Sequence, residues 1–122
     1  MLYAVFCYSQ EAAVMSWSKA KEDDLMQRLA TVQEKLVADG ELGPHGRLMP
    51  TTAATTIRIG RELAVVDGPF AETKEQLLGF YLLDCETFEE ALEATRKLAL
   101  ERESGALELR PLRHFVPGKT LA

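Results

Sequence analysis

The sequence is short of basic residues, and this shortage excludes two classes of partner. Its 19 Asp and Glu outnumber its 14 Lys and Arg, which gives a formal net charge of −5, and the basic residues form no run. Nucleic acids and anionic membrane surfaces attract clustered positive charge. We therefore expect the protein to bind neither nucleic acid nor membrane.

Long apolar stretches, cysteines and histidines are also scarce. No apolar stretch approaches the roughly 20 residues of a membrane-spanning helix, and no basic segment precedes the N-terminal apolar run as in a signal peptide. We expect a cytoplasmic protein, in which a disulfide between Cys7 and Cys85 is unusual. Both cysteines are interpreted as structural, and Cys7 as a packed core thiol. The two histidines are far apart in the sequence, so no metal site is expected. No motif in the sequence implies a redox cofactor.

Two short runs carry apolar side chains on both faces and predict the central strands of a sheet. The chain has 122 residues, 47% of them hydrophobic, which suits one globular domain over residues 1–113 with a C-terminal tail over residues 114–122. The runs 2–8 and 77–83 are too short for buried helices and contain aromatic residues, as buried strands do.

Capping and turn residues divide the rest of the chain. Ser18 is a predicted N-cap for a helix ending near Asp39, where Gly40 stops it, and Thr87 caps a second helix, with Glu90 completing a capping box. We expect loops over residues 9–17 and 43–46. We also expect strands over residues 55–59 and 63–66, joined by a tight type II′ turn, and a last strand that Pro111 restricts to the sheet edge.

This order of elements predicts an α+β fold, a ferredoxin-like βαββαβ sheet with an extra hairpin. Two helices cover only one face of such a sheet. The other face would expose a larger apolar patch than monomers usually tolerate, so we expect a homodimer packed sheet against sheet. The alternative is that the tail or the extra hairpin folds over that face.

The stretch before the second apolar run resembles a known family. Residues 67–76 read DGPFAETKEQ and are followed by LLGFYLLD, which is similar to the YCII-related proteins and in particular to their DGPF group. The opening LYAVFCY and the closing ELRPL extend the similarity over most of the chain. The resemblance implies ferredoxin-like subunits paired in a dimeric α+β barrel. It leaves the biochemical role unassigned.

Asp67 is the strongest candidate for a catalytic residue. It follows an apolar segment and precedes Gly68-Pro69, so a turn fixes its carboxylate at the edge of a predicted sheet. A carboxylate held there acts as a general acid or base when its surroundings exclude water. The alternative is structural, because Asp before Gly is a common turn residue that bonds its own backbone.

Four further residues are candidates for substrate binding. Glu72 and Lys74 share a face of an extended segment, where Lys74 would bind an anionic group; the alternative is an exposed ion pair that contributes little. Phe70 would line an apolar pocket, as would Tyr81, although both residue types are more often core. His45 lies in a predicted loop and is a candidate because histidine as a residue type can gain or lose a proton near neutral pH, whereas His114 lies in the tail.

Three functions remain open from the sequence. The first is a small enzyme that uses Asp67 as an acid–base group on a small polar or anionic molecule bound between helices and sheet. The second is a non-enzymatic ligand-binding or regulatory module, since DGPF-type relatives often accompany extracytoplasmic-function sigma factors. The third is a purely structural dimer.

Overall fold

The computed structural model describes residues 1–121, and Ala122 of the predicted tail lies outside them. The chain alternates strands and helices around one sheet and adds a separate hairpin. In chain order the elements are β1 (Leu2–Gln10), α1 (Glu11–Met15), α2 (Lys19–Ala38), β2 (Leu42–Arg47), a short 3₁₀ turn η1 (Thr51–Ala53), β3 (Thr55–Arg58), β4 (Ala64–Asp67), β5 (Glu75–Asp84), α3 (Phe88–Leu100) and β6 (Ala106–Pro111).

The main sheet has four strands in the order β2-β5-β1-β6, and all neighbours are antiparallel. The two strands with apolar residues on both faces, β1 and β5, lie at its centre, as predicted. β6 forms one edge of the sheet. Pro111, which has no backbone N–H, therefore pairs with only one neighbouring strand. The expected α+β class is therefore confirmed.

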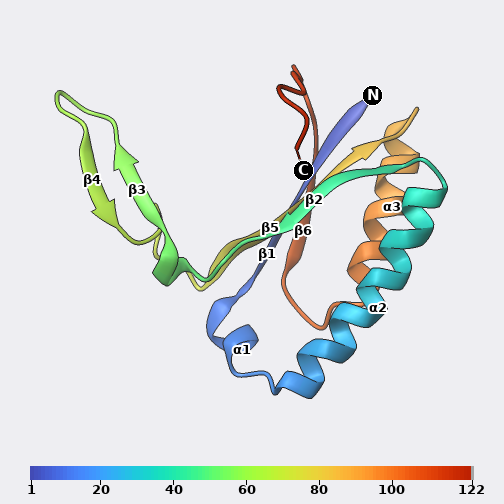
Figure 1. Ribbon diagram of the computed structural model, residues 1–122, viewed down its shortest axis with the longest axis horizontal. Helices are drawn as coiled ribbons and strands as arrows, with labels where there is room; N and C mark the ends of the chain where they lie inside the picture. The colour runs from blue at the N-terminus through green and yellow to red at the C-terminus, as the bar shows by residue number, and fades with distance from the viewer. Residues whose placement is uncertain (122) are drawn as a thin grey trace.

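Helices α2 and α3 lie together on one side of this sheet (Figure 1). The core forms between them: Val5 of β1 and Leu83 of β5 pack with Leu36 of α2 and Leu98 of α3, all at most 1% exposed. Side chains alternate along a strand, so the residues next to Val5 and Leu83 point to the opposite face. Phe6 and Phe80 pair directly on that face, and Phe80 remains 37% exposed.

The helix ends follow the sequence. Ser18 Oγ accepts a hydrogen bond from the Lys21 amide at 3.1 Å, and Thr87 Oγ1 accepts one from the Glu90 amide at 3.1 Å. Gly40, with φ of 76°, follows α2 in the left-handed region. The predicted loop over residues 9–17 is wrong in part, because residues 11–15 form α1.

The loop predicted at residues 43–46 is also wrong, since these residues belong to β2. Glycine and proline suggested a turn, but here glycine permits close packing of neighbouring strands. A Cβ at Gly46 would lie 3.1 Å from the Phe80 ring, and a Cβ at Gly79 would lie 2.9 Å from the Gly46 carbonyl oxygen. Pairing with β5 therefore decides the conformation of this segment.

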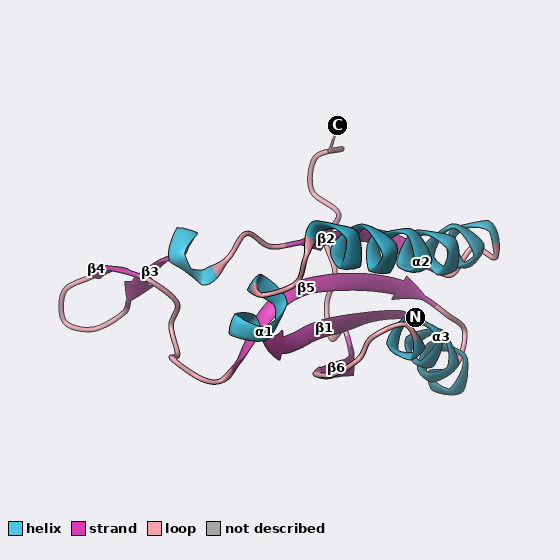
Figure 2. Cartoon of the chain, turned by 90° about the horizontal axis from the view of Figure 1, so that it is seen from below, coloured by secondary structure: helices cyan, strands magenta, loops and turns pink. Residues whose placement is uncertain are grey.

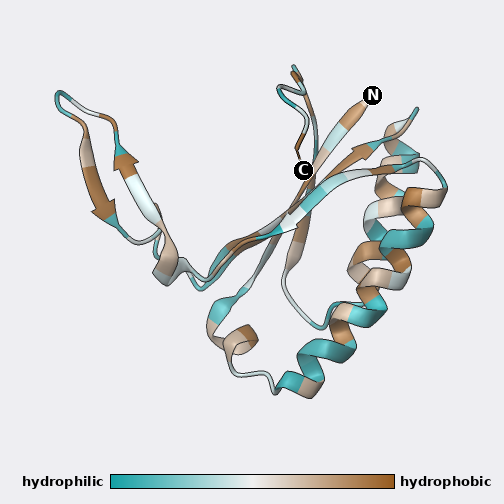
Figure 3. Cartoon of the chain, in the orientation of Figure 1, coloured by the Kyte–Doolittle hydropathy of each residue, from teal (hydrophilic) through white to brown (hydrophobic). Residues whose placement is uncertain are grey.

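Strands β3 and β4 form a separate two-stranded hairpin, which we call the arm (residues 55–67). The arm projects away from the main sheet (Figure 1; Figure 2), and its strands carry strongly hydrophobic positions (Figure 3). Ile57, Leu63 and Val65 are 60%, 69% and 70% exposed. The predicted two-residue turn is wrong: Arg58 pairs with Ala64, so five residues connect the strands, and Gly60 lacks the positive φ of a type II′ turn.

The Thr87 cap gives a first testable prediction. Thr87→Ala removes the oxygen that accepts the Glu90 amide, and we expect it to lower the free energy of unfolding by about 1 kcal/mol. Urea denaturation followed by circular dichroism measures the change. Thr52→Ala, at an exposed position outside the long helices, serves as the control and should leave the midpoint unchanged. Equal midpoints for wild type and Thr87→Ala would contradict the assigned cap.

Candidate functional site

Asp67 is the last residue of β4 and lies opposite Thr55 at the base of the arm. The backbone after it is firmly held: the Gly68 amide donates to the Ala54 carbonyl at 2.8 Å, and Thr56 Oγ1 donates to the Gly68 carbonyl at 2.8 Å. Gly68 itself has φ of 101°. The Asp67 carboxylate is exposed and makes no ion pair within residues 1–121. A single chain thus fixes its position without enclosing it.

The other candidates from the family-like stretch lie in the segment that joins the arm to β5. Phe70 is 75% exposed, and the Arg58 guanidinium lies 5.3 Å from the centre of its ring. Glu72 and Lys74 are both exposed, and no ion pair joins them in the described part of the chain. A hydrogen bond crosses this segment: Gln76 Nε2 donates to the Ala71 carbonyl at 2.9 Å. These side chains face solvent beside the arm.

His45 lies apart from them, on β2 of the main sheet. Its ring stacks on Tyr81 with centroids 5.5 Å apart, and its Nδ1 is 3.0 Å from the Gly43 carbonyl oxygen. Tyr81 is 5% exposed and belongs to the core, whereas His45 is exposed. The structure therefore separates His45 from Asp67.

Sequence reasoning missed a polar group around the Tyr81 hydroxyl, which we call the Tyr81 cluster (Cys7, Gln33, Tyr81 and Arg102). Arg102 Nη2 lies 3.0 Å from the hydroxyl and Gln33 Nε2 lies 3.1 Å from it. The same Nη2 is 3.9 Å from Cys7 Sγ. The only signal in the sequence was a tyrosine and a cysteine inside apolar runs, and nothing marked Gln33 or Arg102.

Both thiols are buried and free. Burial raises the pKa of Cys7, an effect that the Arg102 charge partly opposes. Burial, together with a hydrogen bond to Glu41, raises the pKa of Cys85 to about 11. Both groups therefore remain protonated at neutral pH, which makes them poor nucleophiles.

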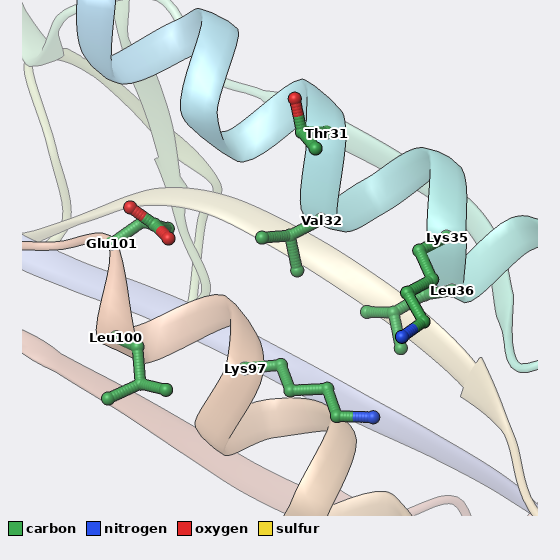
Figure 4. Close-up of a pocket in the computed structure, with 7 residues that line it drawn as sticks. All are labelled: Thr31, Val32, Lys35, Leu36, Lys97, Leu100 and Glu101. Carbon is green, nitrogen blue, oxygen red and sulfur yellow. The ribbon is translucent and has the colours of Figure 1, made fainter.

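Two hollows of similar size open on the helix side of the molecule. The first, about 210 Å³, is a groove between α2 and α3 with Val32, Leu36 and Leu100 among its lining residues and Lys35 and Lys97 beside them (Figure 4). The second, about 200 Å³, lies at the connection between α3 and β6, and Arg102 contributes to its wall. None of the predicted site residues lines either hollow.

Among residues 1–121, no three His, Cys, Asp or Glu side chains are grouped so as to hold a metal ion. None of the helices described has the length and hydrophobicity needed to cross a bilayer.

The sequence matches the YCII-related domain over residues 1–116. It is also similar to an uncharacterized protein of Rhizobium meliloti (strain 1021), with 52% identity over 121 residues, which covers 98% of each chain. The family match spans almost the whole sequence and includes the arm, the main sheet and the Tyr81 cluster. The chain therefore belongs to the family of YCII-related domains.

Proposed function

We propose that the protein is a cytoplasmic homodimer of ferredoxin-like subunits, closed into an α+β barrel, and that it acts as an enzyme on a small polar or anionic molecule. The antiparallel order β2-β5-β1-β6 supports the ferredoxin-like arrangement, since a split βαββαβ unit places its first and third strands at the centre. The arm is the addition to that plan.

The uncovered face of the main sheet supports the dimer. Phe6 of β1 and Phe80 of β5 pair at its centre, and Leu77, also on β5, is 37% exposed. The alternative prediction is that the extra hairpin folds over this face, but the arm projects away from the sheet and does not cover it (Figure 1). Burying this face against a second copy stabilises the assembly by roughly 25 cal/mol per Å² of apolar area.

The arm is the observation that carries the proposed activity. Hydrogen bonds to Gly68 anchor the backbone next to Asp67, and the exposed aliphatic side chains of the arm lose contact with water only when another surface covers them. A second subunit lying against the arm would enclose Asp67 between apolar walls, where a carboxylate takes up and releases protons more readily at neutral pH. In the adjoining segment, Lys74 would bind an anionic group, with Glu72 and Phe70 beside the substrate.

Asp67→Asn tests this role because it keeps the shape of the side chain and removes its charge. A panel of small polar and anionic compounds is screened by thermal shift against both proteins. We expect a compound that stabilises the wild type to bind Asp67→Asn about 10- to 100-fold more weakly, as the loss of a hydrogen bond to a charged group implies.

Glu62→Gln is the matched control, since Glu62 is an exposed carboxylate in the connection between β3 and β4. It should respond as the wild type does. Identical responses of Asp67→Asn and wild type to every compound would remove Asp67 from the site.

A second candidate is a non-enzymatic ligand-binding or regulatory module associated with an extracytoplasmic-function sigma factor. The exposure of Asp67 in a single chain favours it, because a solvated carboxylate is a poor acid–base catalyst. This candidate predicts that a compound found by the screen binds and is recovered unchanged after long incubation. Conversion of the compound, followed by NMR, would favour the enzyme.

A further inference from the structure

The Tyr81 cluster contains hydrogen-bond donors in excess of acceptors. The Arg102 guanidinium and the Gln33 amide both donate to the single oxygen of Tyr81, and the remaining member, Cys7, carries a protonated thiol. No carboxylate within residues 1–121 forms an ion pair with Arg102. In addition, Arg102 Nε is buried without a hydrogen-bond partner in the described chain.

The acidic neighbours of Arg102 are already paired with other cations. Glu101 Oε2 lies 2.9 Å from Arg28 Nη1, and Glu103 Oε2 lies 3.0 Å from Lys21 Nζ. Arg102, between them in the sequence, turns instead toward Tyr81. A positive charge partly removed from water without a counter-ion is unfavourable, as is a buried N–H that donates to nothing. Such a group calls for a specific explanation, and a role in binding an anion provides one.

Space for an anion lies next to this arginine. Arg102 lines the hollow of about 200 Å³ at the connection between α3 and β6, together with Ala99, Glu103, Ser104 and Leu107. The Glu103 carboxylate in this lining is already paired with Lys21 Nζ at 3.0 Å. The Arg102 guanidinium reaches the Tyr81 hydroxyl, and the exposed His45 ring stacks on the Tyr81 ring. This place is on the helix side of the main sheet, separate from Asp67 on the arm.

We propose that Arg102, with Tyr81 and Gln33, binds the carboxylate of a small monocarboxylic acid in this hollow. A guanidinium presents two parallel N–H groups that match the two oxygens of a carboxylate. One arginine neutralises a monoanion fully, whereas a phosphate dianion would keep an uncompensated charge. Because the Nε–H is out of contact with solvent, the guanidinium turns toward the hollow on binding, which changes its contact with Tyr81.

The test is an NMR titration of the intact protein with sodium benzoate at constant ionic strength, with sodium phosphate and sodium chloride as parallel titrants. The side-chain amide of Gln33 is the reporter, because it shares the Tyr81 oxygen with Arg102. We expect benzoate to shift this signal with saturation and the two other salts to leave it in place. Arg102→Met should abolish the shift, while Arg96→Met, which removes an exposed arginine of α3, should preserve it.

Stability separates a binding role from a structural one. If Arg102 serves a ligand, Arg102→Met should leave the melting temperature of the free protein equal or higher, because an unpaired charge is replaced by an apolar chain. Tyr81→Phe is the second variant, and it should weaken benzoate binding with the core retained. The proposal is overturned if benzoate leaves the Gln33 signal of the wild type unshifted, if Arg102→Met binds it equally well, or if phosphate produces the saturable shift.

Discussion

Phe80→Glu is expected to convert the proposed homodimer into monomers. The side chain lies on the face of the main sheet that the helices leave uncovered, directly opposite Phe6. In a sheet-to-sheet dimer the new carboxylate would be buried against apolar side chains of the second subunit. An unpaired charge in such a place costs several kcal/mol, so the dissociation constant should rise by roughly 100-fold or more.

Size-exclusion chromatography with light scattering at micromolar concentration measures the change. The variant should still fold, since Phe80 is already 37% exposed in the single chain. Leu100→Glu is the matched control: it places the same charge on α3, where Leu100 is 81% exposed on the helix side. A wild type that is monomeric, or a dimer broken by Leu100→Glu and not by Phe80→Glu, would contradict the sheet-to-sheet assembly.

The main elements could be predicted because local signals and packing agree there. The runs that form β1 and β5 are apolar on both faces, and this pattern alone places them at the centre of a sheet. Ser18 and Thr87 set the starts of the two long helices by accepting backbone amide hydrogens. In each case the residue type and its neighbours favour one conformation.

β2 shows where such reasoning fails. Gly-Pro-His-Gly is typical of a turn, and no local feature favours a strand. The segment extends because β5 offers it hydrogen bonds, and because Gly46 leaves room for the Phe80 ring. Likewise Gly60 suggested a tight turn, but the register of β3 and β4 requires a longer connection. Long-range pairing decides both conformations, and a single sequence does not display it.

The two candidate sites also differ in how far the sequence alone predicts them. The family-like stretch drew attention to Asp67, whose position on the arm follows from the short strand before it. The Tyr81 cluster joins residues from β1, α2, β5 and the end of α3, up to 95 positions apart in the sequence. No spacing rule brings them together, so only the fold reveals that Arg102 faces a tyrosine instead of a carboxylate.

Gly105→Ala is expected to have the largest effect on stability, because two unfavourable terms coincide at this glycine. Its φ is 95°, which disfavours any residue with a Cβ. A Cβ there would lie 2.2 Å from the Tyr8 carbonyl oxygen, an impossible contact with the backbone of β1. Relief requires β6 to move away from β1 at the point where Ala106 pairs with Tyr8.

The free energy of unfolding should fall by about 3 kcal/mol, adding roughly 1 kcal/mol for the backbone strain to about 2 kcal/mol for overpacking. Gly40→Ala isolates the first term, since Gly40 has φ of 76° and open space around its Cβ position. Urea denaturation of the two variants therefore measures the clash as a difference. If both variants lose the same stability, β6 does not pack as closely against β1 as this geometry requires. The wall of the hollow beside Arg102 would then differ from the one described above.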